Sequence, residues 1–146
     1  MATNSQGVFD LTMAMIDEVN DIGQTDHADT KEYKDRSLHI INVLMGELYM
    51  YSDTYLTPEK GKRSIPTPVF TFEEPIEALD DYICRSVLPY GLAAHLLLDE
   101  NPSAASFFQQ RYEELKGLLA RGLNVGSEEI VDVYGGFAHC EYGYWR

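Results

Sequence analysis

The sequence has few basic residues, few cysteines and no long apolar run. Its 146 residues include 11 Lys and Arg against 24 Asp and Glu, which gives a formal net charge of −13. Because contacts with nucleic-acid phosphates need clustered Lys and Arg, this balance argues against sequence-specific nucleic-acid binding. It favours solubility, a basic partner or a wall that repels DNA. No apolar run approaches the length of a membrane span, so no membrane insertion is expected.

Metal-binding and phosphate-binding patterns are also missing. None of the four histidines is followed three or four residues later by another histidine or a cysteine, so we expect no metal and no cofactor. The pair Gly135-Gly136 opens no helix and is not a phosphate loop. We expect no signal peptide at the start of the chain, and we expect Cys84 and Cys140 to be free thiols in a reducing compartment.

Candidate catalytic residues occur in surroundings that favour structural roles. Cys84 falls on an apolar helix face, where we expect a buried, inert thiol. His95 lies within the apolar run 92–98 and is expected to be a core histidine with a hydrogen-bond partner. The adjacent carboxylates at 80–81 and 113–114 are typical of solvated helix faces. The sequence therefore predicts no catalytic residue.

Apolar periodicity predicts a mainly α, compact single domain spanning residues 1–146. Each expected helix has apolar side chains at helical spacing along one face. We place four helices at about residues 8–22, 30–52, 76–98 and 102–121. The apolar face expected for the first helix consists of Val8, Leu11, Met15, Val19 and Ile22.

The stretch from about residue 76 to residue 121 carries the most specific pattern, two helices joined at a sharp turn. Asn101 is expected to cap the second helix, and Pro102 suits its first position, where the missing N–H has no intrahelical partner. In a continuous first helix, Pro89 would remove the hydrogen bond to the Arg85 carbonyl and bend the axis. The bend either lets the helix wrap a small core or forms a hinge that shapes a subunit interface.

Two stretches outside the helices are candidate interaction segments. Prolines and a glycine in residues 53–75 predict a long central loop, which is either functional or a surface wrap. Residues 130–142 predict a short C-terminal β-hairpin, which packs on its own chain or on a neighbour because a lone hairpin is marginally stable. The candidate subunit or partner interface consists of Tyr134, Phe137, Tyr142, Tyr144 and Trp145.

Two helical stretches resemble the small head–tail connector, or adaptor, proteins of tailed bacteriophages and prophages. One runs from Leu88 to Lys116 and reads LPYGLAAHLLLDENPSAASFFQQRYEELK, with an acidic-Asn-Pro turn and a Phe-x-x-x-Tyr-Glu pattern. The other runs from Asp29 to Leu48 and reads DTKEYKDRSLHIINVLMGEL. The resemblance implies a helical core with extended arms, whose copies form a homo-oligomeric ring below the portal protein and receive neck or tail-completion proteins.

The resemblance also implies a structural protein without catalytic residues. It would be found in the bacterial cytoplasm during assembly and in the neck of the virion, where an acidic channel wall lets DNA slide past. A second hypothesis is a small acidic cytosolic module that binds another protein, such as an inhibitor, an immunity protein or an adaptor. The charge and the ten tyrosines fit this hypothesis equally well. A third is a thiol or histidine enzyme that uses Cys84 and His95.

Overall fold

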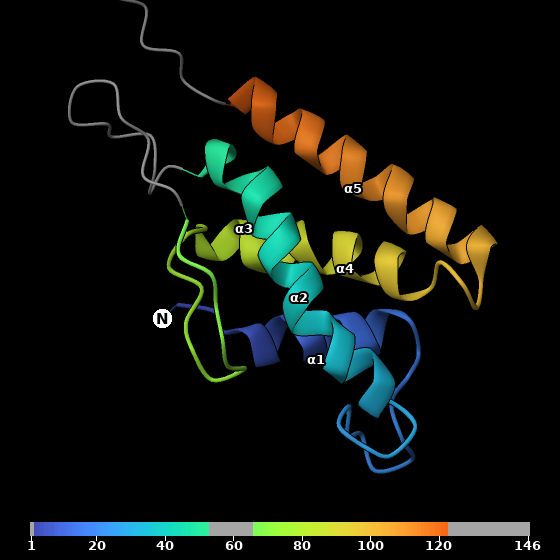
Figure 1. Cartoon of the computed structure of the whole chain (residues 1–146). Helices are drawn as coiled ribbons and strands as arrows, with labels where there is room; N and C mark the ends of the chain where they lie inside the picture. The colour runs from blue at the N-terminus through green and yellow to red at the C-terminus, as the bar shows by residue number, and fades with distance from the viewer. Residues whose placement is uncertain (1, 53–65, 123–146) are drawn as a thin grey trace, which may run out of the picture.

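The computed structural model describes residues 2–52 and 66–122, and these residues form a helical domain around a common core (Figure 1). The expectation of a mainly α fold is confirmed. Within the described residues no β-strand is present, and one isolated antiparallel bridge pairs Asn4 with Pro75. The expected hairpin at 130–142 and part of the expected central loop, 53–65, lie outside these residues. The elements are α1 (Ser5–Met15), α2 (Lys31–Leu48), the 3-10 helix η1 (Tyr49–Tyr51), α3 (Asp81–Ser86), α4 (Leu88–Leu96) and α5 (Pro102–Gly122).

Helix α4 is the centre of the domain and contacts α1, α2, α3 and α5. Figure 1 shows α5 along one side of α4, α1 on the other side and α2 crossing it. Such a helix is covered on several sides because it is apolar nearly all round. Its buried residues are Leu88, Pro89, Gly91, Leu92, Ala93, Ala94 and Leu96.

Helix α1 is shorter than the helix expected at 8–22 and begins three residues earlier. Asn4 caps it, because the side-chain oxygen of Asn4 accepts a hydrogen bond from the Gly7 N–H at 2.9 Å. The helix ends at Met15, and Asp17 takes a positive φ of 63°, a left-handed conformation that stops a helix of L-residues. The expectation that this helix continues to residue 22 was therefore wrong.

The buried face of α1 also differs from the expected one. Leu11, Val19 and Ile22 are exposed, so the expected apolar face was wrong at these positions. A threonine lies in the core instead, because the Thr12 hydroxyl donates to the Val8 carbonyl of its own helix at 2.8 Å. Burying a hydroxyl that already has a hydrogen-bond partner costs little free energy. The spacing of apolar residues does not indicate that such a polar residue is buried. The buried residues of α1 are Ser5, Val8, Phe9, Thr12 and Met13.

The third expected helix, at 76–98, is divided and begins later. Its first half is α3, which begins at Asp81, and Val87 separates it from α4. Pro89 is in the first turn of α4 rather than inside a continuous helix. The break precedes the proline because its ring would clash with the Arg85 carbonyl in a continuous helix. The expected bend is thus an interruption at Val87.

Residues 66–80 lie on the helices as an irregular segment. The side chain of Asn42 bonds both backbone groups of Val69, each at 2.8 Å. The Ile76 N–H donates to the Thr3 carbonyl at 2.9 Å. This bond and the antiparallel bridge between Asn4 and Pro75 hold the start of the expected third helix against the N-terminal segment.

Helices α2 and α5 match their expected positions closely. The expected helix at 30–52 is α2 followed by η1, and the one at 102–121 is α5. Asn101 caps α5 as expected, because its side-chain oxygen accepts a hydrogen bond from the Ala104 N–H at 3.1 Å. These boundaries are encoded by neighbouring residues, and the sequence analysis located them to within a few positions.

Candidate functional site

The two residues of the enzyme hypothesis do not share a cavity. Cys84 is fully buried in the core, which confirms its expected burial, and it does not line the pocket beside His95. Burial, with smaller contributions from Asp81 and Asp80, raises the pKa of the Cys84 thiol to about 12. A thiol held in its neutral form is a poor nucleophile at neutral pH.

His95 is exposed, so the expectation of a core histidine was wrong. It lies in the last turn of α4, beside a shallow apolar pocket of about 440 Å³ between α4 and α5. The run 92–98 is buried except at His95 and Leu98, and both of these residues line the pocket. The residues lining this pocket are Ala94, His95, Leu98, Ala105, Ser106, Gln109 and Gln110.

The paired carboxylates do not converge on a cleft within the described part of the chain. Asp81 accepts a hydrogen bond from the Thr3 N–H at 2.8 Å and another from the Thr3 hydroxyl, and Arg85 lies 3.3 Å from its second oxygen. The Thr3 hydroxyl is the main reason that the pKa of Asp81 is lowered. Asp81 therefore fastens the N-terminal segment to α3. Glu113 and Glu114 are exposed on α5 and pair with residues of the same helix.

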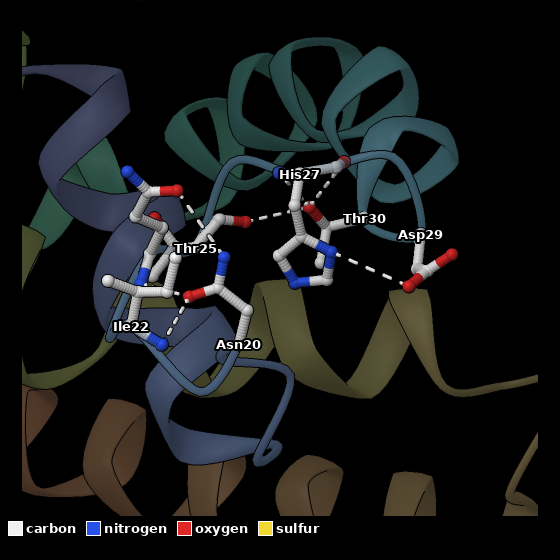
Figure 2. Close-up of polar contacts among 7 residues, drawn as sticks. Asn20, Ile22, Thr25, His27, Asp29 and Thr30 are labelled. Carbon is white, nitrogen blue, oxygen red and sulfur yellow. Dashed lines mark hydrogen bonds and ion pairs between the residues drawn. The ribbon is translucent and has the colours of Figure 1, made fainter.

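The loop between α1 and α2 is built by short-range polar contacts (Figure 2). Asn20 accepts hydrogen bonds from the Ile22 N–H at 3.1 Å and the Gln24 N–H at 2.7 Å. The Thr30 hydroxyl lies 2.7 Å from the Thr25 carbonyl oxygen. These contacts satisfy the backbone of a connection that has no regular structure.

His27 and Asp29 lie next to one another in that loop, but they form no metal site. The His27 Nδ1 atom lies 3.7 Å from an Asp29 oxygen, and Figure 2 shows the two side chains facing one another. A metal ion needs at least three convergent protein ligands. Across residues 2–52 and 66–122, no three His, Cys, Asp or Glu side chains are grouped closely enough to hold one.

Tyr112 fastens α5 to the rest of the domain. Its ring is buried against Gly91 of α4, and its hydroxyl donates to Glu47 of α2 at 3.0 Å. Lys116 lies 3.7 Å from the same carboxylate and 4.9 Å from the centre of the Tyr112 ring. Burial and the Glu47 carboxylate raise the pKa of Tyr112, which keeps the phenol neutral. One residue thus joins the three helices.

The C-terminal half of α5 forms one wall of an apolar groove of about 410 Å³. The opposite wall comes from η1 and the start of α3. Leu118 is 56 % exposed and Tyr82 is 63 % exposed, so the groove has large apolar side chains in contact with solvent. The lining residues are Tyr51, Asp80, Tyr82, Ile83, Leu115, Leu118, Leu119 and Gly122.

This groove was not predicted from the sequence, which indicated a different interface. Leu118 lies beside the helical stripe that Tyr112, Leu115 and Leu119 share, and this additional leucine was the available signal that the apolar surface of α5 is wider than one stripe. The proposed interface residues all lie outside the described residues. They are Tyr134, Phe137, Tyr142, Tyr144 and Trp145.

Comparisons with known proteins found no match to a protein-family model, to a curated protein or to a solved structure. None of the helices in residues 2–52 and 66–122 combines the length and the apolar character needed to cross a membrane. The groove at the end of α5 and the pocket beside His95 both place exposed side chains beside an apolar cavity.

Proposed function

We propose that this protein is a structural subunit of a phage or prophage head–tail connector. The observation that carries the proposal is that the two stretches with the family resemblance, 29–48 and 88–116, pack against one another. They contain α2 and the α4–α5 pair, and α4 contacts both α2 and α5. The hydrogen bond from Tyr112 to Glu47 joins the two stretches directly. Because the two stretches are in contact, their resemblance to the connector proteins is better explained by one shared helical unit than by two unrelated similarities.

The surface of α5 supports a role in assembly. Only Ala105 and Tyr112 of this 21-residue helix are buried. Phe107 is 63 % exposed, and Leu98, just before the helix, is 60 % exposed. Apolar side chains gathered on one exposed helix are typical of protein–protein contacts. In a ring, neighbouring subunits or a partner would cover them.

The proposed partners are the portal protein and the neck or tail-completion proteins, with copies of this chain arranged in a ring. The net charge of −13 fits a channel wall along which DNA moves without binding. The proposed location is the bacterial cytoplasm during assembly and the neck of the virion afterwards. The function requires no catalytic residue and no cofactor.

Co-expression with the portal protein of the same genome tests this function. We expect the chain alone to elute at low mass and the portal complex to carry a ring of this subunit, measured by light scattering and electron microscopy. Phe107→Asp should weaken ring formation, whereas Phe70→Asp, at a site 72 % exposed outside α5, should leave it unchanged. A portal protein that never binds the chain would contradict the proposal.

The alternative function is a small acidic module that binds one other protein. The observation behind it is the groove at the end of α5, where exposed Leu118 and Tyr82 offer an apolar surface to one segment of a partner. The light-scattering experiment separates the two functions. A one-to-one complex with a non-portal partner, and no ring under any condition, would favour the alternative.

A further inference from the structure

The groove lined by η1, α3 and α5 lies where the described chain ends. Gly122 is the last residue of α5 and also one of the lining residues of the groove. Residues 123–146 therefore start at its edge. Figure 1 shows the C-terminal end of α5 on the same side of the domain as η1 and α3. A segment that starts there is tethered beside an apolar surface.

The residues that follow α5 have the composition that this groove would accept. They include Tyr134, Phe137, Tyr142, Tyr144 and Trp145, and three of these five aromatic residues fall within the last five positions. Each aromatic side chain buries about 150–250 Å² when it is covered. The groove walls offer leucines and an isoleucine together with the rings of Tyr51 and Tyr82. Aromatic side chains pack well on such a mixed surface.

The length of the segment permits it to return to the groove. An extended chain reaches about 3.3–3.6 Å per residue, so the 12 residues from Gly122 to Tyr134 exceed the dimensions of the groove several times over. Gly126 and the pair Gly135-Gly136 supply positions at which the chain can reverse. The segment is therefore long enough to reach the groove and has glycines at which the chain can reverse direction.

We propose that the aromatic end of residues 123–146, including Trp145, occupies this groove in its own chain. Because this segment is covalently joined to the end of α5, its effective concentration at the groove is roughly millimolar. At micromolar protein, the chain's own segment is therefore favoured over a second copy. Residues 53–65 are poorer candidates by composition, because they contain one aromatic residue, Tyr55, and three cations that gain nothing from an apolar surface. The proposal does not depend on the connector function.

Trp145 provides the test, because it is the only tryptophan of the chain. In the full-length protein we expect blue-shifted tryptophan emission and several-fold weaker quenching by acrylamide than for free tryptophan amide. Leu118→Asp should shift the emission to the red and restore strong quenching. Tyr82→Asp, on the opposite wall of the groove, should do the same. Both sites are more than half exposed, so the helical circular dichroism should stay unchanged.

Leu98→Asp is the matched control. Leu98 is 60 % exposed, close to the 56 % of Leu118, but it lines the other pocket. It should leave the Trp145 emission unchanged. Strong quenching of Trp145 in the wild type would overturn the proposal. So would an emission that responds to Leu98→Asp and not to Leu118→Asp, since the segment would then lie in the pocket beside His95.

Dilution distinguishes the chain's own segment from that of a second copy. We expect the protection of Trp145 to stay constant while the protein concentration falls a hundredfold, with a monomer mass by light scattering. Protection that disappears on dilution, together with a dimer mass at high concentration, would assign the groove to a second copy and overturn the proposal.

Discussion

Tyr112 lies so close to Gly91 that no side chain fits between them. A Cβ atom added to Gly91 would lie 2.9 Å from Cε2 and 3.0 Å from Cδ2 of Tyr112, and 3.1 Å from Cδ1 of Leu44. The Tyr112 ring is itself buried and held at its hydroxyl by Glu47. The packing of α5 on α4 therefore depends on a glycine inside a helix.

Replacing Gly91 by alanine should lower the free energy of unfolding, whereas the same replacement at an unhindered helical glycine should raise it. Gly91→Ala should lower the free energy of unfolding by up to about 2 kcal/mol, because overpacking costs about 1–3 kcal/mol and the better helix propensity of alanine offsets about 1 kcal/mol. Gly46→Ala on α2 should instead raise it by about 0.5–1 kcal/mol, since an added Cβ meets no atom within 4 Å there. Urea denaturation measures both. Equal stabilisation by the two substitutions would contradict the packing argument.

Substitutions of Tyr112 should separate its ring from its hydroxyl. Tyr112→Phe should cost about 1 kcal/mol, the typical net contribution of one hydrogen bond, because Glu47 remains solvated. Tyr112→Ala should cost about 3–5 kcal/mol, as expected for a large buried aromatic side chain. Thermal and urea unfolding measure both. Tyr82→Phe is the control and should have no effect, since Tyr82 is exposed.

Stability should fall at alkaline pH. Burial and Glu47 raise the pKa of Tyr112, and burial and the hydrogen bond to Glu100 raise the pKa of Tyr33, both from 10.0. A group whose pKa is higher in the folded chain stabilises it fully below the unfolded pKa and loses this contribution as pH rises. The free energy of unfolding should therefore decrease above about pH 10, by up to ~1.4 kcal/mol per pH unit for each group.

The phenylalanine variants provide the control for this pH dependence. Tyr112→Phe and Tyr33→Phe should each make the decrease above about pH 10 shallower than in the wild type. Urea denaturation of the three proteins between about pH 8 and about pH 11 measures the slopes. Identical slopes in all three proteins would show that the two phenols do not cause the alkaline loss of stability.

Asn42 should be required to hold the segment 66–72 on α2. Asn42→Ala removes both hydrogen bonds to the Val69 backbone, and we expect a loss of about 1–3 kcal/mol from two bonds. Asn42→Asp keeps an acceptor for the Val69 N–H and should cost less. Protease cleavage within 66–72 should increase in parallel. His39→Ala, at an exposed position on the same helix, should leave stability and cleavage unchanged.

The Cys84 thiol should be inert in the folded protein. Burial raises its pKa to about 12 from 9.0, which lowers the thiolate fraction at neutral pH about a thousandfold. In a Cys140→Ser background, a thiol reagent should react with native Cys84 only as fast as the core opens. Urea should accelerate the reaction by orders of magnitude. Rapid labelling of the native protein would revive the hypothesis of a thiol enzyme.

Local signals in the sequence located several elements well. Asn101 and Pro102 mark the start of α5, because a cap and a residue without an N–H act on backbone groups within a few positions. Pro89 indicated a bend in the helix for the same reason, although the structure has a break at Val87 where a continuous bent helix was expected. The burial of Cys84 followed from its apolar neighbours on one helix face.

Other features depended on residues distant in sequence and could not be predicted. The start of α3 at Asp81 depends on Thr3, which bonds both Asp81 and the backbone of Ile76. His95 is exposed although its neighbours are apolar, because no element in residues 2–52 and 66–122 covers its side of α4. From the sequence, Gly91 is only a residue that weakens a helix. The structure shows that its missing side chain leaves room for the Tyr112 ring.

The sequence by itself determined that this chain is mainly helical and where α2 and α5 lie, because helical hydrogen bonds and caps join residues a few positions apart. Only the tertiary structure decided which apolar faces are covered and which remain open. The contacts that cover a face, such as Tyr112 on Gly91 or Thr3 on Asp81, join residues that are far apart in the chain. For the same reason the groove beside Leu118 became visible only when η1, α3 and α5 were placed together.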